Sequence, residues 1–374
     1  MKPFQLIPAV AEYEDFAAYA KEANLGPDDL ILTNEYIFEP TISALNLGCQ
    51  TLFQEKYGMG EPTDVMVNGI LDELRDKKYT RIIAVGGGTI IDIAKVLAVA
   101  TEKDQVDDLY DRMPDGLKKV HPLVIVPTTC GTGSEVTNIS IVNRTTKGVK
   151  QGIVAPAMYA DEAALITGML SSLPYPVFAT SSIDAMIHAV ESYLSPNATS
   201  LSEMFSEQAL NLILAGWKKA VAAGGNDAWK ESAQEFLRAS NWAGIAFGNA
   251  GCAAVHATSY PVGGVHHVPH GQSNQLMFEA VMKKYQEKKP VGKLNQLEEI
   301  LARSLDCAPE NALDALYKLM DDVLVNDHLR AHGVTEDELP GYAKSVIETQ
   351  QRLLNNNYVE LTEEDILDIY KMAF

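Results

Sequence analysis

Short apolar runs alternate with amphipathic segments along the first half of the chain. The runs are rich in Val, Ile and Leu, which predicts buried strands, and the amphipathic segments have the helical period. The predicted strands are 29–33, 81–85 and 120–126, and the predicted helices are 12–24, 63–79 and 89–101. Residues 137–154, rich in β-branched side chains, indicate a strand pair or an irregular excursion. Such alternation is typical of a parallel sheet covered by helices on both faces, so we predict an α/β domain over residues 1–175.

The pattern changes after Pro174. From about residue 177 onward, long segments with a 3.6-residue period predict an all-helical domain over residues 176–374. Two capping boxes, Thr335 to Glu338 and Thr362 to Asp365, mark the starts of late helices. We expect the ligand site in a cleft between the two domains.

The charge balance of the 374 residues narrows the class of partner. Thirty basic residues against 50 acidic ones give a net charge of −20, which argues against a broad surface for nucleic acid or anionic membranes. The chain has no uncharged apolar stretch of about 18 residues and no secretory signal pattern. Its four cysteines lack CxxC spacing, which is typical of reduced thiols. We therefore expect a cytoplasmic protein that acts on a small molecule.

A glycine turn follows the strand predicted at 81–85. Gly86, Gly87 and Gly88 lie between that strand and a helix in RIIAVGGGTIIDIAK. Glycine lets a ligand approach the backbone, and the free N–H groups of the following helix favour an anion such as a pyrophosphate. The spacing is not GxGxxG, so a purely structural turn is the alternative interpretation.

A second turn, VPTTCGTGSE at 126–135, also follows an apolar strand. It offers hydroxyl groups from Thr128, Thr129, Thr132 and Ser134. Two such turns at the carboxyl ends of strands favour a crevice for the phosphates and riboses of a dinucleotide. After strand 29–33, Asn34 can bond ribose hydroxyls and Glu35 would repel a 2′-phosphate, which favours NAD over NADP.

One acid and three histidines form a candidate metal site. Asp184 and His188, four residues apart in a helical segment, project from one helix face. His256 lies in another helical segment, and His270 lies where a loop enters the next helix. Without a thiolate this set suits Fe²⁺ or Zn²⁺, and we expect iron first because it accepts a fifth ligand more readily. The alternative is an ordinary hydrogen-bonded Asp/His pair, although packing does not explain why four of the eight histidines fall within 256–270.

These residues lie in motifs that resemble, in order and over essentially the full length, those of the iron-dependent (group III) alcohol dehydrogenase family. The motifs are GGGxxxDxxK (Gly86–Lys95), PTTxGTGSE (Pro127–Glu135), DAxxHAxE (Asp184–Glu191) and the pair formed by His256 and His270-Gly271. The resemblance implies a dehydroquinate synthase-like fold. In that fold a Rossmann-like, parallel-sheet dinucleotide-binding domain precedes a helical metal-binding domain.

The resemblance also implies roles for individual residues. It assigns the metal to Asp184, His188, His256 and His270. It places Gly87, Gly88, Thr128 and Thr129 along the NAD molecule, with Lys150 reaching it. The same turns add Gly86, Thr89, Asp92, Thr132 and Ser134 to the expected cofactor site. Family members commonly carry Asp where this chain has Asn34.

The common HxxxH motif of the family is changed here, because Tyr260 replaces its second histidine. Tyr260 is a candidate to relay a proton or bind the substrate, with simple packing as the alternative. Within the family, HATSYPVGG, HVPHG and QQRLLNNNY resemble enzymes that interconvert 4-hydroxybutyrate and succinate semialdehyde with NAD. For the carboxylate of such a substrate we expect His266 or His267 as the partner, with Arg144 or a lysine as the alternative.

Two other activities are consistent with parts of the pattern. A dehydrogenase of the same family for 1,3-propanediol or butanol would differ only in its substrate pocket. A lyase of the dehydroquinate synthase type would use NAD only transiently and would need a basic cluster near the ligands, which the sequence lacks. We expect a homo-oligomer of two or more subunits that acts on a small hydroxy acid or aldehyde, without a nucleic-acid or membrane partner.

Overall fold

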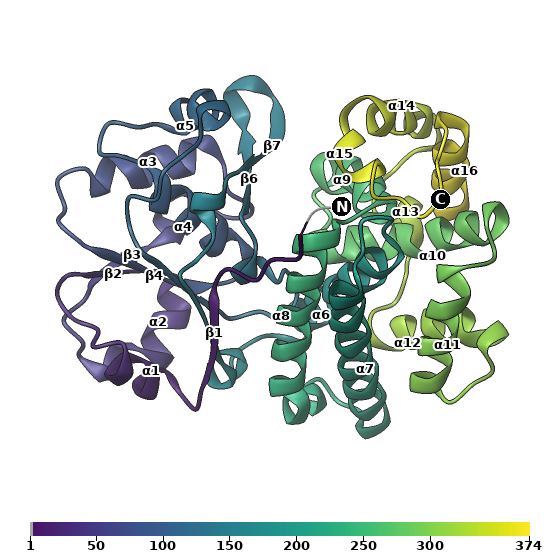
Figure 1. Cartoon of the computed structure of the whole chain (residues 1–374), viewed down its shortest axis with the longest axis horizontal. Helices are drawn as coiled ribbons and strands as arrows, with labels where there is room; N and C mark the ends of the chain where they lie inside the picture. The colour runs from purple at the N-terminus through teal and green to yellow at the C-terminus, as the bar shows by residue number, and fades with distance from the viewer. Residues whose placement is uncertain (1–2) are drawn as a thin grey trace. The chain divides into compact units, whose positions relative to one another are not determined.

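A computed structural model describes residues 3–374, which form two compact units (Figure 1). An α/β unit spans Leu6–Leu173 and a helical unit spans Pro174–Phe374. Residues 3–5 also belong to the helical unit, where the backbone N–H of Gln5 donates to Oδ1 of Asn249 at 2.7 Å.

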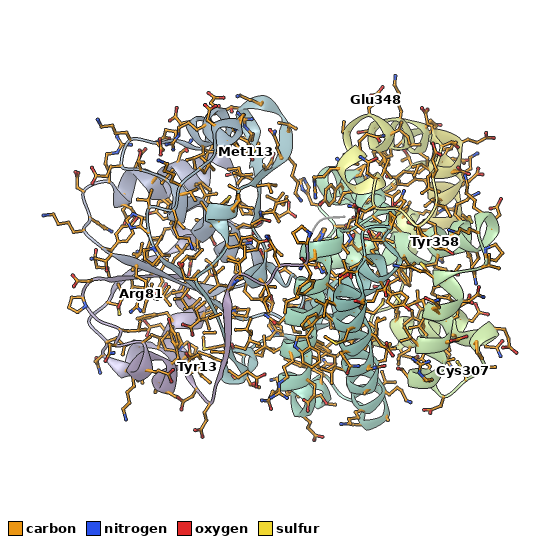
Figure 2. All side chains as sticks on the ribbon, viewed as in Figure 1. Tyr13, Arg81, Met113, Cys307, Glu348 and Tyr358 are labelled. Carbon is orange, nitrogen blue, oxygen red and sulfur yellow. The ribbon has the colours of Figure 1, made fainter. Side chains whose placement is uncertain are left out.

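The α/β unit is built on a six-stranded parallel sheet with the strand order β1-β8-β5-β4-β2-β3. Its strands are β1 (Ala9–Tyr13), β2 (Asp29–Thr33), β3 (Gln50–Phe53), β4 (Arg81–Gly86), β5 (Leu123–Pro127) and β8 (Glu162–Ile166). At one edge Tyr13 (Figure 2) donates a hydrogen bond of 2.8 Å to Glu162 and so ties β1 to β8. Gly86 pairs with Pro127, so the carboxyl ends of β4 and β5 lie side by side. The predicted parallel sheet is confirmed.

Helices bury both faces of this sheet. The helices are α1 (Phe16–Glu22) and α2 (Glu35–Thr41) on one face and α3 (Asp64–Leu74), α4 (Gly88–Val99) and α5 (Val106–Arg112) on the other. Along β4, Ile82 and Ala84 join the core under α3, α4 and α5, whereas Ile83 and Val85 join the core under α1 and α2. Because successive side chains point to opposite faces, a strand that is covered twice reads as one continuous apolar run.

The sequence mislocated the start of the first helix. Residues 12–24 were expected to be helical throughout, but β1 takes the first two of them, and α1 begins only after Asp15. The carboxylate of Asp15 accepts a hydrogen bond from Ala18 N at 2.7 Å and caps the helix. The strand pair expected within 137–154 is confirmed as the antiparallel strands β6 (Ile139–Arg144) and β7 (Val149–Val154).

The second unit is all-helical, as predicted. Its helices are α6 (Tyr175–Leu194), α7 (Ser200–Ala223), α8 (Ala233–Ala250), α9 (Ala254–His266), α10 (His270–Lys288), α11 (Lys293–Leu305), α12 (Ala312–Val323), α13 (His328–Ala331), α14 (Leu339–Thr349), α15 (Gln351–Leu354) and α16 (Glu363–Ala373). Thr362 caps α16 through Asp365, as the capping box predicts. Among residues 3–374, no helix combines the length and hydropathy that a membrane span requires.

Candidate active site

Three helices bring the four predicted metal ligands together. α6 carries Asp184 and His188 one turn apart, α9 carries His256 in its first turn, and α10 begins at His270. Oδ1 of Asp184 lies 3.9 Å from one imidazole Nε2 atom and 3.6 Å from each of the other two. The Nε2 atoms of His188 and His256 are 3.0 Å apart. One carboxylate oxygen and three imidazole nitrogens therefore converge.

A glycine allows α10 to come this close to α6. A Cβ atom at Gly271 would lie 2.0 Å from the carbonyl oxygen of Thr180, which no side chain could avoid because the obstacle is backbone. With only a hydrogen at this position, the first turn of α10 packs directly on the turn of α6 that precedes Asp184. The glycine next to His270 therefore has a packing role that positions the histidine.

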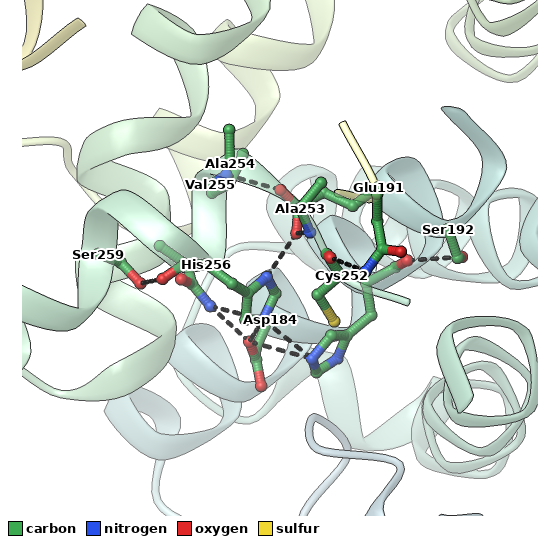
Figure 3. Close-up of polar contacts among 12 residues, drawn as sticks. Asp184, Glu191, Ser192, Cys252, Ala253, Ala254, Val255, His256 and Ser259 are labelled. Atoms are coloured by element: carbon green, nitrogen blue, oxygen red, sulfur yellow. Dashed lines mark hydrogen bonds and ion pairs between the residues drawn. The ribbon is translucent and has the colours of Figure 1, made fainter. Parts of the chain in front are cut away.

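Glu191 fixes the orientation of the His256 ring (Figure 3). This carboxylate is 2% exposed, and its Oε2 accepts hydrogen bonds from Nδ1 of His256 at 2.6 Å and from Ala253 N at 2.9 Å. Its Oε1 accepts from Val255 N at 2.6 Å. Because Nδ1 is the donor to Glu191, Nε2 of His256 is directed at the other three ligand atoms.

The charges in this cluster favour a cation at its centre. Burial alone would raise the pKa of Asp184, but the surrounding imidazoles outweigh burial and hold that pKa below its usual range. Burial lowers the pKa of His188. Burial also opposes a charge on His256, yet Glu191 and Asp184 outweigh it and raise the pKa of this ring. The two buried carboxylates thus favour positive charge between them, which a bound cation would supply.

Asn274, on the second turn of α10, places its side-chain amide among the ligand atoms. Its Nδ2 lies 2.8 Å from Oδ1 of Asp184, 3.2 Å from Nε2 of His256 and 3.3 Å from Nε2 of His270. Its Oδ1 is buried and has no hydrogen-bond partner within residues 3–374. If the amide turned over, an oxygen lone pair would face the same centre, which suits a cation.

The separations of the donor atoms fit a single metal ion. Ligand atoms that bind one ion at about 2.0–2.2 Å lie roughly 3–4 Å apart. The three distances from Oδ1 of Asp184 to the imidazoles and the distance between Nε2 of His188 and Nε2 of His256, from 3.0 to 3.9 Å, fall in this range. The orphaned oxygen of Asn274 and the mixed oxygen/nitrogen donors agree with a transition metal such as iron.

Cys252 is a neighbour that the sequence did not indicate. Its Sγ and a ring nitrogen each of His188 and His256 all lie within 4.8 Å of one another, and Figure 3 shows the thiol beside the cluster. The residue is buried, and burial raises the pKa of its thiol well above the usual value. Cys252 belongs to no metal-binding sequence motif such as CxxC, and only the folding of distant segments brings it beside these histidines, so the sequence did not reveal it.

The three candidate catalytic residues lie in different surroundings. The Tyr260 ring centroid is 6.1 Å from that of His270, and burial raises the pKa of the Tyr260 hydroxyl. His266 instead contacts Tyr342 OH at 2.9 Å and Glu338 at 3.2 Å through Nε2. His267 is exposed and adopts a left-handed conformation (φ 56°) at the end of α9. Of these three, Tyr260 is the one with a ring contact to a predicted metal ligand.

In the α/β unit, the two small-residue turns lie against each other. A Cβ atom on Gly87 would be 3.2 Å from Cγ2 of Thr129, and one on Gly88 would be 3.1 Å from Cγ2 of Thr132. The N–H of Thr128 donates to the carbonyl of Gly86 at 3.1 Å. The turns after β4 and β5 therefore form one surface at the carboxyl edge of the sheet, where α/β folds bind nucleotides.

Several predicted cofactor residues also hold these turns in place. The hydroxyl of Ser134 donates to Oδ1 of Asp92 at 3.2 Å, and Thr89 Oγ1 donates to the carbonyl of Gly60 at 3.0 Å. Lys95 is fully buried and donates to Ser134 Oγ at 2.7 Å. The spacing of Asp92 and Lys95 in the motif thus has a structural explanation, which the sequence alone did not provide.

The end of β2 carries more negative charge than the sequence indicated. Asn34 Nδ2 donates to Oε2 of Glu55 at 2.9 Å, and the N–H of Glu35 donates to Oε1 of the same carboxylate at 2.6 Å. Glu55 lies in the segment that follows β3, and the apolar pattern of the sequence did not predict β3. Glu55 is therefore a second acid beside Glu35, and it too would repel a 2′-phosphate at this position. Lys150, which was expected to reach NAD, pairs with Glu61 at 2.7 Å.

Comparison with known proteins covers nearly the whole chain. The family description "Iron-containing alcohol dehydrogenase" matches residues 12–167, and "Fe-containing alcohol dehydrogenase family, C-terminal" matches residues 178–374. A 4-hydroxybutyrate dehydrogenase from Clostridium kluyveri is 46% identical over 374 residues, covering 100% of both chains. A 1,3-propanediol dehydrogenase from Citrobacter freundii is 30% identical over 322 residues, covering 84% of this chain and 81% of its own.

Solved structures share the architecture. That of a 1,3-propanediol oxidoreductase superposes with a TM-score of 0.84 at 25% identity and covers 100% of both chains. That of sulfoacetaldehyde reductase from Bifidobacterium kashiwanohense, in complex with NAD⁺, has a TM-score of 0.84 at 20% identity, covering 100% of this chain and 98% of that one. At this identity the second structure supports the fold alone.

Proposed function

The chain belongs to the iron-containing alcohol dehydrogenase family, and we propose that it transfers a hydride between NAD and 4-hydroxybutyrate. In this reaction the alcohol carbon gives a hydride to NAD⁺ and the hydroxyl gives up a proton, which yields succinate semialdehyde and NADH. The 46% identity to the Clostridium kluyveri enzyme over both full chains supports this substrate. The observation that carries the proposed chemistry is the convergence of Asp184 with three imidazoles, at 3.6–3.9 Å from Oδ1.

We propose that iron is held by Asp184, His188, His256 and His270, with zinc as the alternative metal. An ion bound there supplies Lewis acidity to the alcohol or aldehyde oxygen of the substrate. Glu191 keeps Nε2 of His256 directed at the ion, and the ionised Asp184 offsets part of its charge. His270 has 34% of its side chain exposed, so the set can be reached by a small molecule from this side.

The α/β unit is the proposed NAD site. NAD supplies the hydride acceptor and donor, and the protein orients it. Backbone N–H groups at the start of α4 favour the pyrophosphate, and Gly86, Gly87 and Gly88 let it approach. Thr128 and Thr129 offer hydroxyls on the adjoining turn. The acids Glu35 and Glu55 at the end of β2 favour NAD over NADP, because they would repel a 2′-phosphate.

Tyr260 is proposed to bind the substrate oxygen or to relay its proton. A tyrosine hydroxyl is protonated at neutral pH, and burial raises the pKa of this one further, so Tyr260 can donate a hydrogen bond to that oxygen. Its position beside His270 agrees with this role. We further propose that the protein acts in the cytoplasm as a homo-oligomer.

A substrate panel tests the proposed function. Iron-reconstituted protein is assayed anaerobically for NADH formation from 4-hydroxybutyrate, 1-butanol and 1,3-propanediol, with NADP in parallel. We expect kcat/KM for 4-hydroxybutyrate to exceed that of either uncharged alcohol by at least about 10-fold, since recognition of one charged group contributes about that much. A preference for 1-butanol or 1,3-propanediol would overturn the substrate assignment, and equal use of NADP would overturn the cofactor assignment.

A further inference from the structure

The substrate proposed above ends in a carboxylate, and two of the residues expected to bind that group, His266 and Arg144, are already engaged, whereas His267 offers only an exposed imidazole at the end of α9. His266 is engaged by Glu338 and Tyr342, and Arg144 pairs with Asp107 in the α/β unit. With a net charge of −20 the protein repels anionic substrates in general. A cation near the metal ligands would therefore have to be supplied by another residue.

The segment from α15 to Tyr358 is fastened to the stretch that leads into α9. Nδ2 of Asn356 donates to the carbonyl of Cys252 at 2.9 Å and to the carbonyl of Arg352 at 3.2 Å. Gly251 makes room for this contact, because a Cβ there would lie 2.3 Å from Nδ2 of Asn356. At the far end Tyr358, labelled in Figure 2, donates to a backbone carbonyl after α10. The helix α15 packs against α9, the helix that carries His256.

Arg352 is the cation that this segment presents. It is exposed, and within residues 3–374 its guanidinium takes part in no hydrogen bond or ion pair. Two other arginines of the helical unit are already engaged: Arg303 pairs with Glu207, and Arg330 lies over the ring of Phe374. Arg352 therefore retains its five donors for a ligand.

The charge of Arg352 reaches the surroundings of the metal ligands. Burial raises the pKa values of Tyr260 and Cys252, and in both cases the positive charge of Arg352 opposes that rise. Nδ2 of Asn356 bridges the backbone carbonyls of Arg352 and Cys252, and Cys252 lies beside His188 and His256, so the backbone of Arg352 is held close to these ligands. Tyr260 in turn lies beside His270, the most exposed of the four predicted ligands. Tyr260 and Arg352 are thus carried by two helices that pack together, α9 and α15.

We infer that Arg352 binds the carboxylate of the substrate and so selects a hydroxy acid over an uncharged alcohol. This inference rests on the proposed function. The planar guanidinium matches a carboxylate with two parallel hydrogen bonds, which an imidazole cannot offer. The α15 segment, held by Asn356 and Tyr358, is then a specificity element attached to the helix that carries His256.

The test compares Arg352→Gln with Arg352→Lys and with the control Lys344→Gln. Lys344 is an exposed lysine on α14 that pairs loosely with Glu348 at 3.9 Å, so its loss controls for removal of a surface charge. For each protein, kcat and KM are measured with 4-hydroxybutyrate and with 1-butanol, together with metal content. We expect Arg352→Gln to lower the ratio of kcat/KM for 4-hydroxybutyrate to that for 1-butanol by about 10- to 100-fold, mainly through KM.

The other variants sharpen the outcome. Arg352→Lys should recover part of the substrate preference, because lysine restores the positive charge but not the two parallel N–H donors of the guanidinium. Lys344→Gln should leave the preference as in the wild type. Arg352→Glu should shift the preference toward 4-aminobutan-1-ol, because this alcohol carries a positive charge where 4-hydroxybutyrate carries a negative one. An unchanged ratio in Arg352→Gln would overturn the inference while leaving the proposed function standing. A wild type without preference for 4-hydroxybutyrate would overturn the proposed function itself.

Discussion

Each unit of the protein buries a cluster of charged and polar side chains. The two clusters differ in how many of their buried polar atoms have a hydrogen-bond partner within the protein. In the α/β unit Lys95 donates to Ser134 Oγ at 2.7 Å, to Ile139 O at 2.8 Å and to Thr137 Oγ1 at 2.9 Å. An ammonium group has three hydrogens to donate, so each has a partner. In the helical unit, the Nε2 atoms of His188 and His256 face each other at 3.0 Å.

The difference separates a structural cluster from a binding site. The Lys95 cluster is complete without a ligand, because every proton of the ammonium group has an acceptor and Asp92 supplies a nearby negative charge. The histidine cluster directs several lone pairs at one point and, within residues 3–374, leaves the buried oxygen of Asn274 without a partner. A buried polar group without a partner is costly, and a metal ion at the centre of the cluster would remove this cost once the amide turned its oxygen toward the ion.

Removal of one imidazole is the strongest way to test this contrast. His256→Ala should abolish metal binding and lower turnover by at least about 1000-fold, because the ion and its Lewis acidity are lost together. NAD binding, which is assigned to the other unit, should persist. Metal analysis, NADH formation and NAD titration measure the three effects. His328→Asn is the matched control, because His328 is exposed and its positive φ suits Asn. Full metal content in His256→Ala would remove this ring from the ligand set.

Lys95→Met tests whether the buried cluster of the α/β unit stabilises the fold and takes no part in metal binding. It should destabilise the protein by roughly 3–5 kcal/mol, because it leaves the acceptor groups and Asp92 without their buried cation. Metal content should stay as in the wild type. Chemical denaturation measures the free energy of unfolding, and the exposed Lys371→Met serves as the control. A loss below about 1 kcal/mol would show that the Lys95 cluster is not a structural element.

The same variant gives a pH dependence of known sign. Burial lowers the pKa of Lys95 to about 8, although Asp92 and Glu135 act to raise it. Between pH 8 and about 10 the unfolded chain, with an ordinary lysine pKa of about 10.4, binds more protons than the folded one. Over this window the wild type should therefore gain stability relative to Lys95→Met as the pH rises, by at most about 1.4 kcal/mol per pH unit. A difference that narrows with pH would contradict the lowered pKa.

A smaller effect is expected from Glu191→Gln, which leaves all four ligands in place. The amide cannot accept from His256 and from the two backbone N–H groups as a charged carboxylate does. Metal affinity should therefore fall by about 10- to 100-fold. Competition with a chelator measures the affinity, and Glu348→Gln, at an exposed position of α14, is the control. Unchanged affinity would mean that Glu191 does not orient His256 toward the ion.

The sequence could predict features that depend on local spacing. Strand β4 could be predicted because both faces of the sheet are covered, which makes the strand a continuous apolar run. Asp184 and His188 could be placed on one helix face because they are one helical turn apart. His256 and His270 stood out because histidines cluster there. The strand pair β6–β7 was recognisable from its β-branched residues. These signals need no knowledge of distant contacts.

Features that depend on the packing of distant segments could not be predicted. Glu55 reaches Asn34 only because β3 pairs with β2, and β1 was hidden because it is a short, largely exposed edge strand without a buried apolar run. Cys252 lies near the metal ligands only through tertiary packing, and the segment of Arg352 adjoins α9 only because α15 packs against that helix. Tertiary contacts of this kind leave no periodic signal along the chain.

The ligand set itself is tested most directly by X-ray absorption at the iron edge of the reconstituted, fully active protein. The account predicts nitrogen and oxygen neighbours at about 2.0–2.2 Å, outer-shell scattering from three imidazoles and no sulfur neighbour at about 2.3 Å. A sulfur shell, which would assign Cys252 to the ion, or a spectrum without imidazole scattering would contradict it.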